Sequence, residues 1–270
     1  LHRWRVTMLI VFLLFVNFLT KSSHLSHQNQ GYGLDYKEEL AEYSFDRLRE
    51  MIYPDSVIAQ ADSVLTVLEN WKENLGEEKP KMIITSVSGG GLKAAVWAMR
   101  VLQMSDSLTN GHFMEHTTLM TGASGGMIGT AYYRSLHLEN KLGNLQNPND
   151  PIYLDKISKD LLNSMSFSIV SNDIFLPFSG FRYGAHRYIK DRGYMFEKQL
   201  NENTGYIMDR PLSYFRQPEL DAQIPMVIIS PSIVNDARRL LISPHGVSFL
   251  SSVNFEVDNE TGSEIDAVDF

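Results

Sequence analysis

Residues 82–94 read Met-Ile-Ile-Thr-Ser-Val-Ser-Gly-Gly-Gly-Leu-Lys-Ala, a run that passes from an apolar segment through three glycines into a new pattern. Its first part, Met82–Val87, is short and rich in β-branched residues, as expected for a buried parallel strand. From Ala94 onward, apolar residues recur at helical spacing without glycine or proline. The run therefore predicts a strand, a glycine loop and a helix.

The same order of elements recurs further along the chain. Thr117–Thr121 has the composition of a second strand, residues 122–126 read Gly-Ala-Ser-Gly-Gly, and Met127–Leu138 has the pattern of another helix. In open α/β sheets the binding crevice lies outside the carboxyl ends of the strands, where both glycine-rich turns would lie. The sequence thus predicts an α/β fold with a mainly parallel sheet and a site at this edge.

The second turn fits the G-x-S-x-G pattern of a nucleophile elbow. In such an elbow a sharp strand-to-helix turn exposes the serine oxygen, so Ser124 is the candidate nucleophile. Ser124 would also lie at a helix N-terminus, where negative charge is stabilised. The glycines of the first turn, Gly89–Gly91, can bring backbone N–H groups close to a developing oxyanion because they carry no Cβ.

The two motifs together resemble those of the patatin-like phospholipases and the related catalytic domain of cytosolic phospholipase A2. That resemblance implies a three-layer α/β sandwich and a Ser–Asp dyad without histidine. Lys93 stands where the family more often has arginine, and Ala94 stands where many members have another glycine. Carried over by position, the site residues are the nucleophile Ser124; the oxyanion-hole residues Gly89, Gly90, Gly91 and Gly125; and the supporting residues Gly122, Gly126 and Lys93.

The aspartate of the dyad is not evident in the sequence. The family places it in an Asp-Gly type turn well beyond the serine, and this chain contains no Asp-Gly dipeptide. The chain also ends without a helix stop or polar tail, so we expect a fragment whose aspartate lies beyond Phe270. The alternatives are an atypical base such as Asp236 or Asp269, or a domain that has lost its activity.

Two other chemistries are open to the same sequence. An ordinary Ser-His-Asp esterase would use His186 or His245 as its base. The segment His112–His116 fits the H-x-x-E-H zinc pattern, but it is expected to lead directly into a strand, with no helix to align the imidazoles. We therefore predict neither a metal nor another cofactor.

The N-terminal segment is apolar between basic residues. Val6–Leu19 contains only Thr7 and Asn17 as polar residues, and Trp4 and Lys21 suit the two membrane interfaces. Residues 1–21 are predicted to be a transmembrane or signal-anchor segment; a cleaved signal peptide or a core helix is the alternative. A linker and two amphipathic helices (35–51 and 55–75) are predicted in residues 22–78, followed by a truncated acyl hydrolase domain in residues 79–270.

The composition of the chain excludes several classes of function. The chain has 270 residues, of which 43% are hydrophobic, a net charge of -8 and no cysteine. The acidic balance argues against nucleic acid as a partner, and the lack of cysteine excludes disulfides and thiol catalysis.

An aromatic stretch over residues 167–188, interrupted by glycines, predicts an acyl-chain groove or, alternatively, part of the ordinary hydrophobic core. Residues 224–234 and 238–243 predict a β-hairpin. Together these features predict a membrane-associated serine hydrolase of lipid esters; the alternative is an inactive scaffold that binds lipid or protein.

Overall fold

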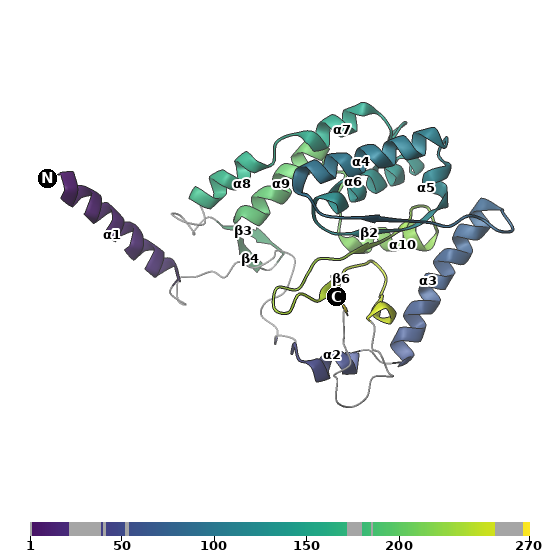
Figure 1. Ribbon diagram of the computed structural model, residues 1–270, viewed down its shortest axis with the longest axis horizontal. Coiled ribbons are helices and arrows are strands. Elements are labelled where there is room, and N and C mark those ends of the chain that lie inside the picture. The colour runs from purple at the N-terminus through teal and green to yellow at the C-terminus, as the bar shows by residue number, and fades with distance from the viewer. Residues whose placement is uncertain are drawn as a thin grey trace. The chain divides into compact units, whose positions relative to one another are not determined.

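The computed structural model describes residues 2–21, 39, 42–51, 54–171, 180–184, 186–251 and 267–270 (Figure 1). The chain divides into two compact units. The first unit combines Leu1–Ala41 with Lys159–Gly205, and the second combines Glu42–Ser158 with Tyr206–Phe270. Both predicted glycine turns belong to the second unit.

A parallel sheet forms the centre of the second unit. Its strands are β1 (Ile83–Val87), β2 (Thr117–Gly122) and β5 (Met226–Ile229), in the order β1-β2-β5. Both pairings are parallel, so the carboxyl ends of all three strands lie at one edge. The predicted α/β architecture with a parallel sheet is confirmed.

Two helices lie side by side over this sheet (Figure 1). They are α4 (Gly91–Leu108) and α6 (Ser124–Lys141), and both begin earlier than predicted because the glycine turns supply their first residues. A Cβ at Gly129 would lie 2.0 Å from the Ala95 carbonyl oxygen, so only glycine permits this approach of α6 to α4. The core between helices and sheet consists of Ala95, Met99, Leu102, Met114, Met120, Tyr132, Tyr133, Leu136 and Ile157.

Shorter helices complete this part of the second unit. They are α5 (His112–His116) before β2 and α7 (Pro151–Ser158) after α6. The prediction that no helix forms at residues 112–116 is wrong. Asp106 accepts a hydrogen bond from the Met114 N–H at 2.9 Å, which fixes this single turn against the end of α4.

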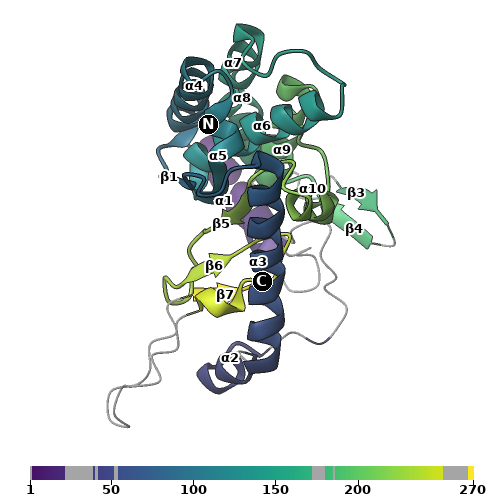
Figure 2. The ribbon, with the colours of Figure 1, turned by 90° about the vertical axis from the view of Figure 1, so that its right-hand side faces the viewer.

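On another side of the unit, α3 (Pro54–Leu75) packs against α10 (Arg216–Leu220), as Figure 2 shows. It also packs against the short helix η3 (Ser248–Leu250). A further short helix, η2 (Leu212–Phe215), precedes α10. The helix predicted over residues 35–51 is shorter in the structure: α2 spans Phe45–Met51, and residues 42–44 are not helical. Most of its remaining residues lie outside the described part of the chain.

The predicted hairpin after residue 224 is only partly present. Strand β6 (Arg239–Leu241) pairs in parallel with β7 (Ala267–Asp269). Isolated antiparallel bridges, Ile229↔Ile242 and Ser232↔Arg239, join this region to the end of β5 and to the residues that follow it. Pro231 lacks an N–H for a ladder, which limits pairing beyond the end of β5. Strand β5 pairs with β2 instead and so extends the parallel sheet.

The first unit contains α1 (His2–Lys21), α8 (Leu162–Ser168), the antiparallel pair β3 (Gly180–Tyr183) and β4 (His186–Ile189), and α9 (Arg192–Thr204). Helix α8 is separate from α7, which ends at Ser158. The carboxylate of Asp160 accepts the Leu162 N–H at 3.0 Å and the Asn163 N–H at 3.2 Å, so a new helix begins there.

The N-terminal helix α1 covers the segment predicted to span a membrane. Among the residues that the structure describes, no helix combines the length and the apolarity needed to cross a bilayer. The predicted membrane helix is therefore not supported.

Candidate active site

Ser124 lies at the point where β2 turns into α6. It is the first residue of α6, its side chain is exposed, and its φ of 55° is in the left-handed region. Gly122 permits the turn, because a Cβ there would lie 2.2 Å from the Val87 carbonyl oxygen on the neighbouring strand. A strained, exposed serine between a strand and a helix is the geometry of a nucleophile elbow.

The glycine loop after β1 packs directly on this elbow. A Cβ at Gly89 would lie 3.0 Å from the Ser124 Cβ, and one at Gly125 would lie 1.8 Å from the Gly91 carbonyl oxygen. A Cβ at Gly126 would likewise lie 2.2 Å from the Ser88 carbonyl oxygen. The structure thus brings together the predicted oxyanion residues and the predicted nucleophile, and the three loop glycines remain exposed to a substrate.

Two helix N-termini meet at this edge of the sheet. Helix α4 begins at Gly91 and α6 begins at Ser124, so both present unpaired backbone N–H groups and the positive ends of their dipoles. Lys93, in the first turn of α4, is exposed. This arrangement favours the negative charge that develops on a carbonyl oxygen during acyl transfer.

The two aspartates considered as atypical bases have other partners. Asp269 Oδ2 accepts hydrogen bonds from the Val247 N–H at 2.9 Å and the Ser248 hydroxyl at 2.8 Å. Asp236 accepts from the Tyr43 hydroxyl at 2.9 Å and the Arg238 N–H at 3.1 Å, as expected of a turn residue. Within the described ranges, no hydrogen bond joins any residue to the Ser124 hydroxyl.

The two histidines considered as bases belong to different units. His186 belongs to β4 of the first unit. His245 is only 3% exposed; its Nδ1 lies 3.5 Å from the Ser63 hydroxyl, and its Nε2 lies 3.4 Å from Glu219 Oε2. His245 therefore belongs to a buried network between α3 and α10.

The Glu219 carboxylate is the centre of that network. It is fully buried and forms an ion pair with the Arg134 guanidinium from α6. Burial raises the pKa of Glu219 to about 8, with Arg134 acting in the opposite direction. Burial also lowers the pKa of His245, and Arg216 and Arg134 lower it further. The sequence did not indicate this network, because Glu219 lies in an otherwise ordinary polar segment.

We expect protonation of His245 to destabilise the fold below pH 6.5, its ordinary pKa. The folded state lowers the pKa of His245, so the unfolded state takes up the proton first as the pH falls. The His245 contribution is present above that pH and is lost as the pH falls toward the folded-state value. Urea unfolding of the wild type and of His245→Gln, between about pH 7.5 and about pH 5.5, measures this loss.

The groups that face His245 are Ser63, Glu219, Arg134 and Arg216, and all of them remain in the variant. The wild type should lose more stability over this interval than His245→Gln, by up to about 1.4 kcal/mol per pH unit. Equal losses in the two proteins would contradict the expected shift.

The H-x-x-E-H segment has the helix but not the geometry of a zinc site. His112 Nδ1 lies 3.0 Å from Glu115 Oε2, whereas His116 Nδ1 lies 2.9 Å from the Lys81 carbonyl oxygen and so faces away from a shared ion. Among the described residues, no group of three or more His, Cys, Asp or Glu side chains could hold a metal ion.

An apolar hollow beside the glycine loop was not predicted from the sequence. It has a volume of about 460 Å³, it reaches Gly89 and Gly126, and its apolar walls include Trp97, Val101 and Phe113. Trp97 and Val101 are exposed on one face of α4, one helical turn apart. The spacing of these two large apolar residues is the feature of the sequence from which the hollow could have been predicted. The groove predicted over residues 167–188 falls partly on residues 172–179 and 185, which lie outside the described residues.

Comparisons with known proteins give one distant structural likeness. No family model and no curated protein sequence matches the chain. The chain is similar to a solved structure of human GIVD cytosolic phospholipase A2 in complex with methyl gamma-linolenyl fluorophosphonate, with 18% identity and a TM-score of 0.41. The likeness covers 72% of this chain and 28% of that one.

Proposed function

We propose that the chain is a patatin-like serine acyl hydrolase that cleaves carboxylic esters of lipids. The observation that carries this proposal is the close packing of the glycine loop on an exposed, strained Ser124 at the carboxyl edge of a parallel sheet. A catalytic serine needs both an exposed hydroxyl and backbone donors beside it. A structural serine in a surface turn needs neither.

In the proposed reaction, the Ser124 Oγ attacks the ester carbonyl carbon while its proton passes to an aspartate. The N–H groups of Gly90, Gly91 and Gly125 donate hydrogen bonds to the oxyanion. The lipid alcohol leaves with a proton, and water then hydrolyses the acyl-serine ester to release a fatty acid and restore the hydroxyl. The resemblance of the motifs supports aspartate as the base.

The substrate class is proposed from the surroundings of Ser124. The hollow of about 460 Å³ begins at Gly89 and Gly126 and offers Trp97, Val101 and Phe113 to an apolar chain. A groove of this volume with apolar walls suits part of an acyl chain. We accordingly propose a membrane lipid as the substrate and a membrane surface as the place of action.

The test uses a fluorophosphonate probe, which labels activated serines. Full-length wild-type protein should be labelled, and Ser124→Ala should lose essentially all labelling because the attacking oxygen is gone. Ser107→Ala, which removes an exposed serine on α4, serves as the matched control and should be labelled like the wild type. Labelling that persists in Ser124→Ala would overturn the proposed nucleophile.

A catalytically inactive lipid-binding scaffold is the second candidate. The observation in its favour is that, in the part of the chain that the structure describes, the Ser124 hydroxyl has no hydrogen-bonded base. A folded full-length protein that resists the probe yet binds phospholipid vesicles would favour this scaffold over the hydrolase.

A further inference from the structure

Helix α4 carries a stripe of large apolar side chains on its exposed face. This α4 stripe consists of Trp97, Val101, Met104 and Leu108, which are between 42% and 79% exposed. Their spacing of four, three and four residues places them one above another along the same side of the helix. Water contact with so much apolar surface is unfavourable, so a contiguous stripe of this kind marks a surface that binds a partner.

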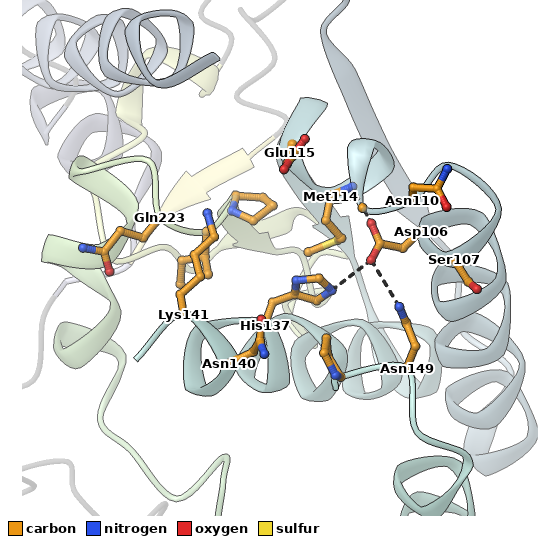
Figure 3. Close-up of a pocket in the computed structure, with 14 residues that line it drawn as sticks. Asp106, Ser107, Asn110, Met114, Glu115, His137, Asn140, Lys141, Asn149 and Gln223 are labelled. Atoms are coloured by element: carbon orange, nitrogen blue, oxygen red, sulfur yellow. Dashed lines mark hydrogen bonds and ion pairs between the residues drawn. The ribbon is translucent and has the colours of Figure 1, made fainter. Parts of the chain in front are cut away.

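The charged residues of α4 are divided between its two faces. Lys93 and Arg100 are exposed and, seven residues apart, lie along one edge of the α4 stripe. The helix contains a single acidic residue, Asp106, which is buried on the opposite face. Its carboxylate lies 3.4 Å from His137 Nε2 and accepts a hydrogen bond from the Asn149 amide, as Figure 3 shows. The exposed face of α4 is therefore apolar, with a basic edge and without a carboxylate.

The α4 stripe is continuous with the hollow beside the candidate active site. Trp97 and Val101 belong to both, and the hollow of about 460 Å³ reaches the glycine loop. Met104 and Leu108 lie outside the hollow and continue the apolar surface to the C-terminal end of α4. Transfer of an acyl chain into water is unfavourable, so a surface that stays apolar up to the hollow lets a lipid leave a bilayer without crossing water.

We propose that the α4 stripe docks on the surface of a bilayer that contains anionic phospholipids. The apolar side chains enter the boundary between headgroups and acyl chains, and Lys93 and Arg100 reach the anionic headgroups. The choice of a lipid as the partner rests on the hydrolase function proposed above. Docking itself requires no catalysis, so the two can be tested separately.

A second copy of the chain fits this face less well. In a twofold contact centred on the α4 stripe, the Arg100 side chains of the two copies would approach each other, because Arg100 lies within one helical turn of the centre. Like charges brought so close oppose association. A bilayer with anionic lipids instead supplies the opposite charge along the whole basic edge.

The absence of cysteine from the chain allows a single introduced cysteine to report on each surface. Full-length Leu108→Cys, carrying an environment-sensitive fluorophore, is mixed with vesicles of phosphatidylcholine and phosphatidylglycerol. We expect a blue shift of its emission and quenching by lipid-bound quenchers. The matched control Leu65→Cys, also exposed and on α3, should show neither. Both variants also carry Ser124→Ala, so that the vesicles are not hydrolysed.

Two further substitutions in the protein labelled at position 108 separate charge from apolar contact. Arg100→Gln should raise the half-saturating concentration of the mixed vesicles about fivefold and leave that of pure phosphatidylcholine vesicles unchanged. Met104→Gln removes an apolar side chain and should weaken binding to both kinds of vesicle. Both positions are exposed on α4, and glutamine favours a helix, so the fold should be retained.

No vesicle-dependent change at position 108, or an equal change at position 65, would overturn the proposal. A shift at position 108 that depends on protein concentration without vesicles would also overturn it, and would assign the α4 stripe to contact between copies. Docking in a protein whose Ser124 resists the fluorophosphonate probe would reject the hydrolase and retain the docking surface. Probe labelling without docking would do the reverse.

Discussion

Replacement of Glu219 by alanine is expected to lower the free energy of unfolding by about 3–5 kcal/mol. Glu219 is fully buried, and it pairs with Arg134, whose side chain is 3% exposed. Arg134 also donates from Nε to the Pro225 carbonyl oxygen at 2.7 Å and stacks over the Phe215 ring at 5.0 Å. Without the carboxylate, a guanidinium that cannot lose its charge remains buried and uncompensated. Urea denaturation followed by tryptophan fluorescence measures the loss.

The double variant Arg134→Met with Glu219→Leu is the control for this prediction. It removes both charges and fills much of the same volume, so no unpaired charge remains. It should be clearly more stable than Glu219→Ala alone. If the double variant is instead the less stable of the two, then the shape of these side chains, and not the charge pairing, determines the stability of this region.

Gly125→Ala is expected to reduce the rate of fluorophosphonate labelling by about 100-fold or more. The new Cβ would lie 1.8 Å from the Gly91 carbonyl oxygen, so the glycine loop must move away from the elbow. Such a movement displaces the Gly90 and Gly91 N–H groups from the oxyanion while leaving the Ser124 hydroxyl in place. The labelling rate, measured at several probe concentrations, reports the loss.

Gly129→Ala is the matched control for the loop. Its Cβ would lie 2.0 Å from the Ala95 carbonyl oxygen, a similar clash one helical turn further along α6 and away from Ser124. It should cost about 1–3 kcal/mol of stability through strained packing of α4 on α6. Its labelling rate should stay close to that of the wild type in the folded fraction. Equal losses of labelling in the two glycine variants would show that helix packing, not the position of the loop, controls reactivity.

The central part of the fold could be predicted because its signals are local. Met82–Val87 and Thr117–Thr121 are runs of β-branched residues, and each is followed by glycines and then by an uninterrupted helical pattern. Such runs favour strands, and the helical periodicity after them favours helices, through interactions between residues close in sequence. The predicted site residues Ser124 and Gly89–Gly91 are close in space for the same reason, since neighbouring parallel strands end at one edge.

The structure predicted from the sequence was wrong where the local sequence signal was weak or misleading. The hairpin after residue 224 had the right composition, but β5 pairs with β2 in the sheet. The helix at residues 112–116 was missed because it is a single turn, held by the distant Asp106 carboxylate. In both cases a contact with a remote part of the chain determines the local structure.

The order of strand, glycine loop and helix, the position of Ser124 at the second turn and the absence of thiol chemistry all follow from the amino-acid sequence alone. The close approach of Gly125 to Gly91 and the ion pair between Arg134 and Glu219, 85 residues apart, became evident from the packing of the folded chain. The two groups of features differ in the sequence separation over which the underlying interactions act. Backbone preference and hydrophobic periodicity act within a few residues, whereas close approaches and charge pairs depend on how distant segments pack together.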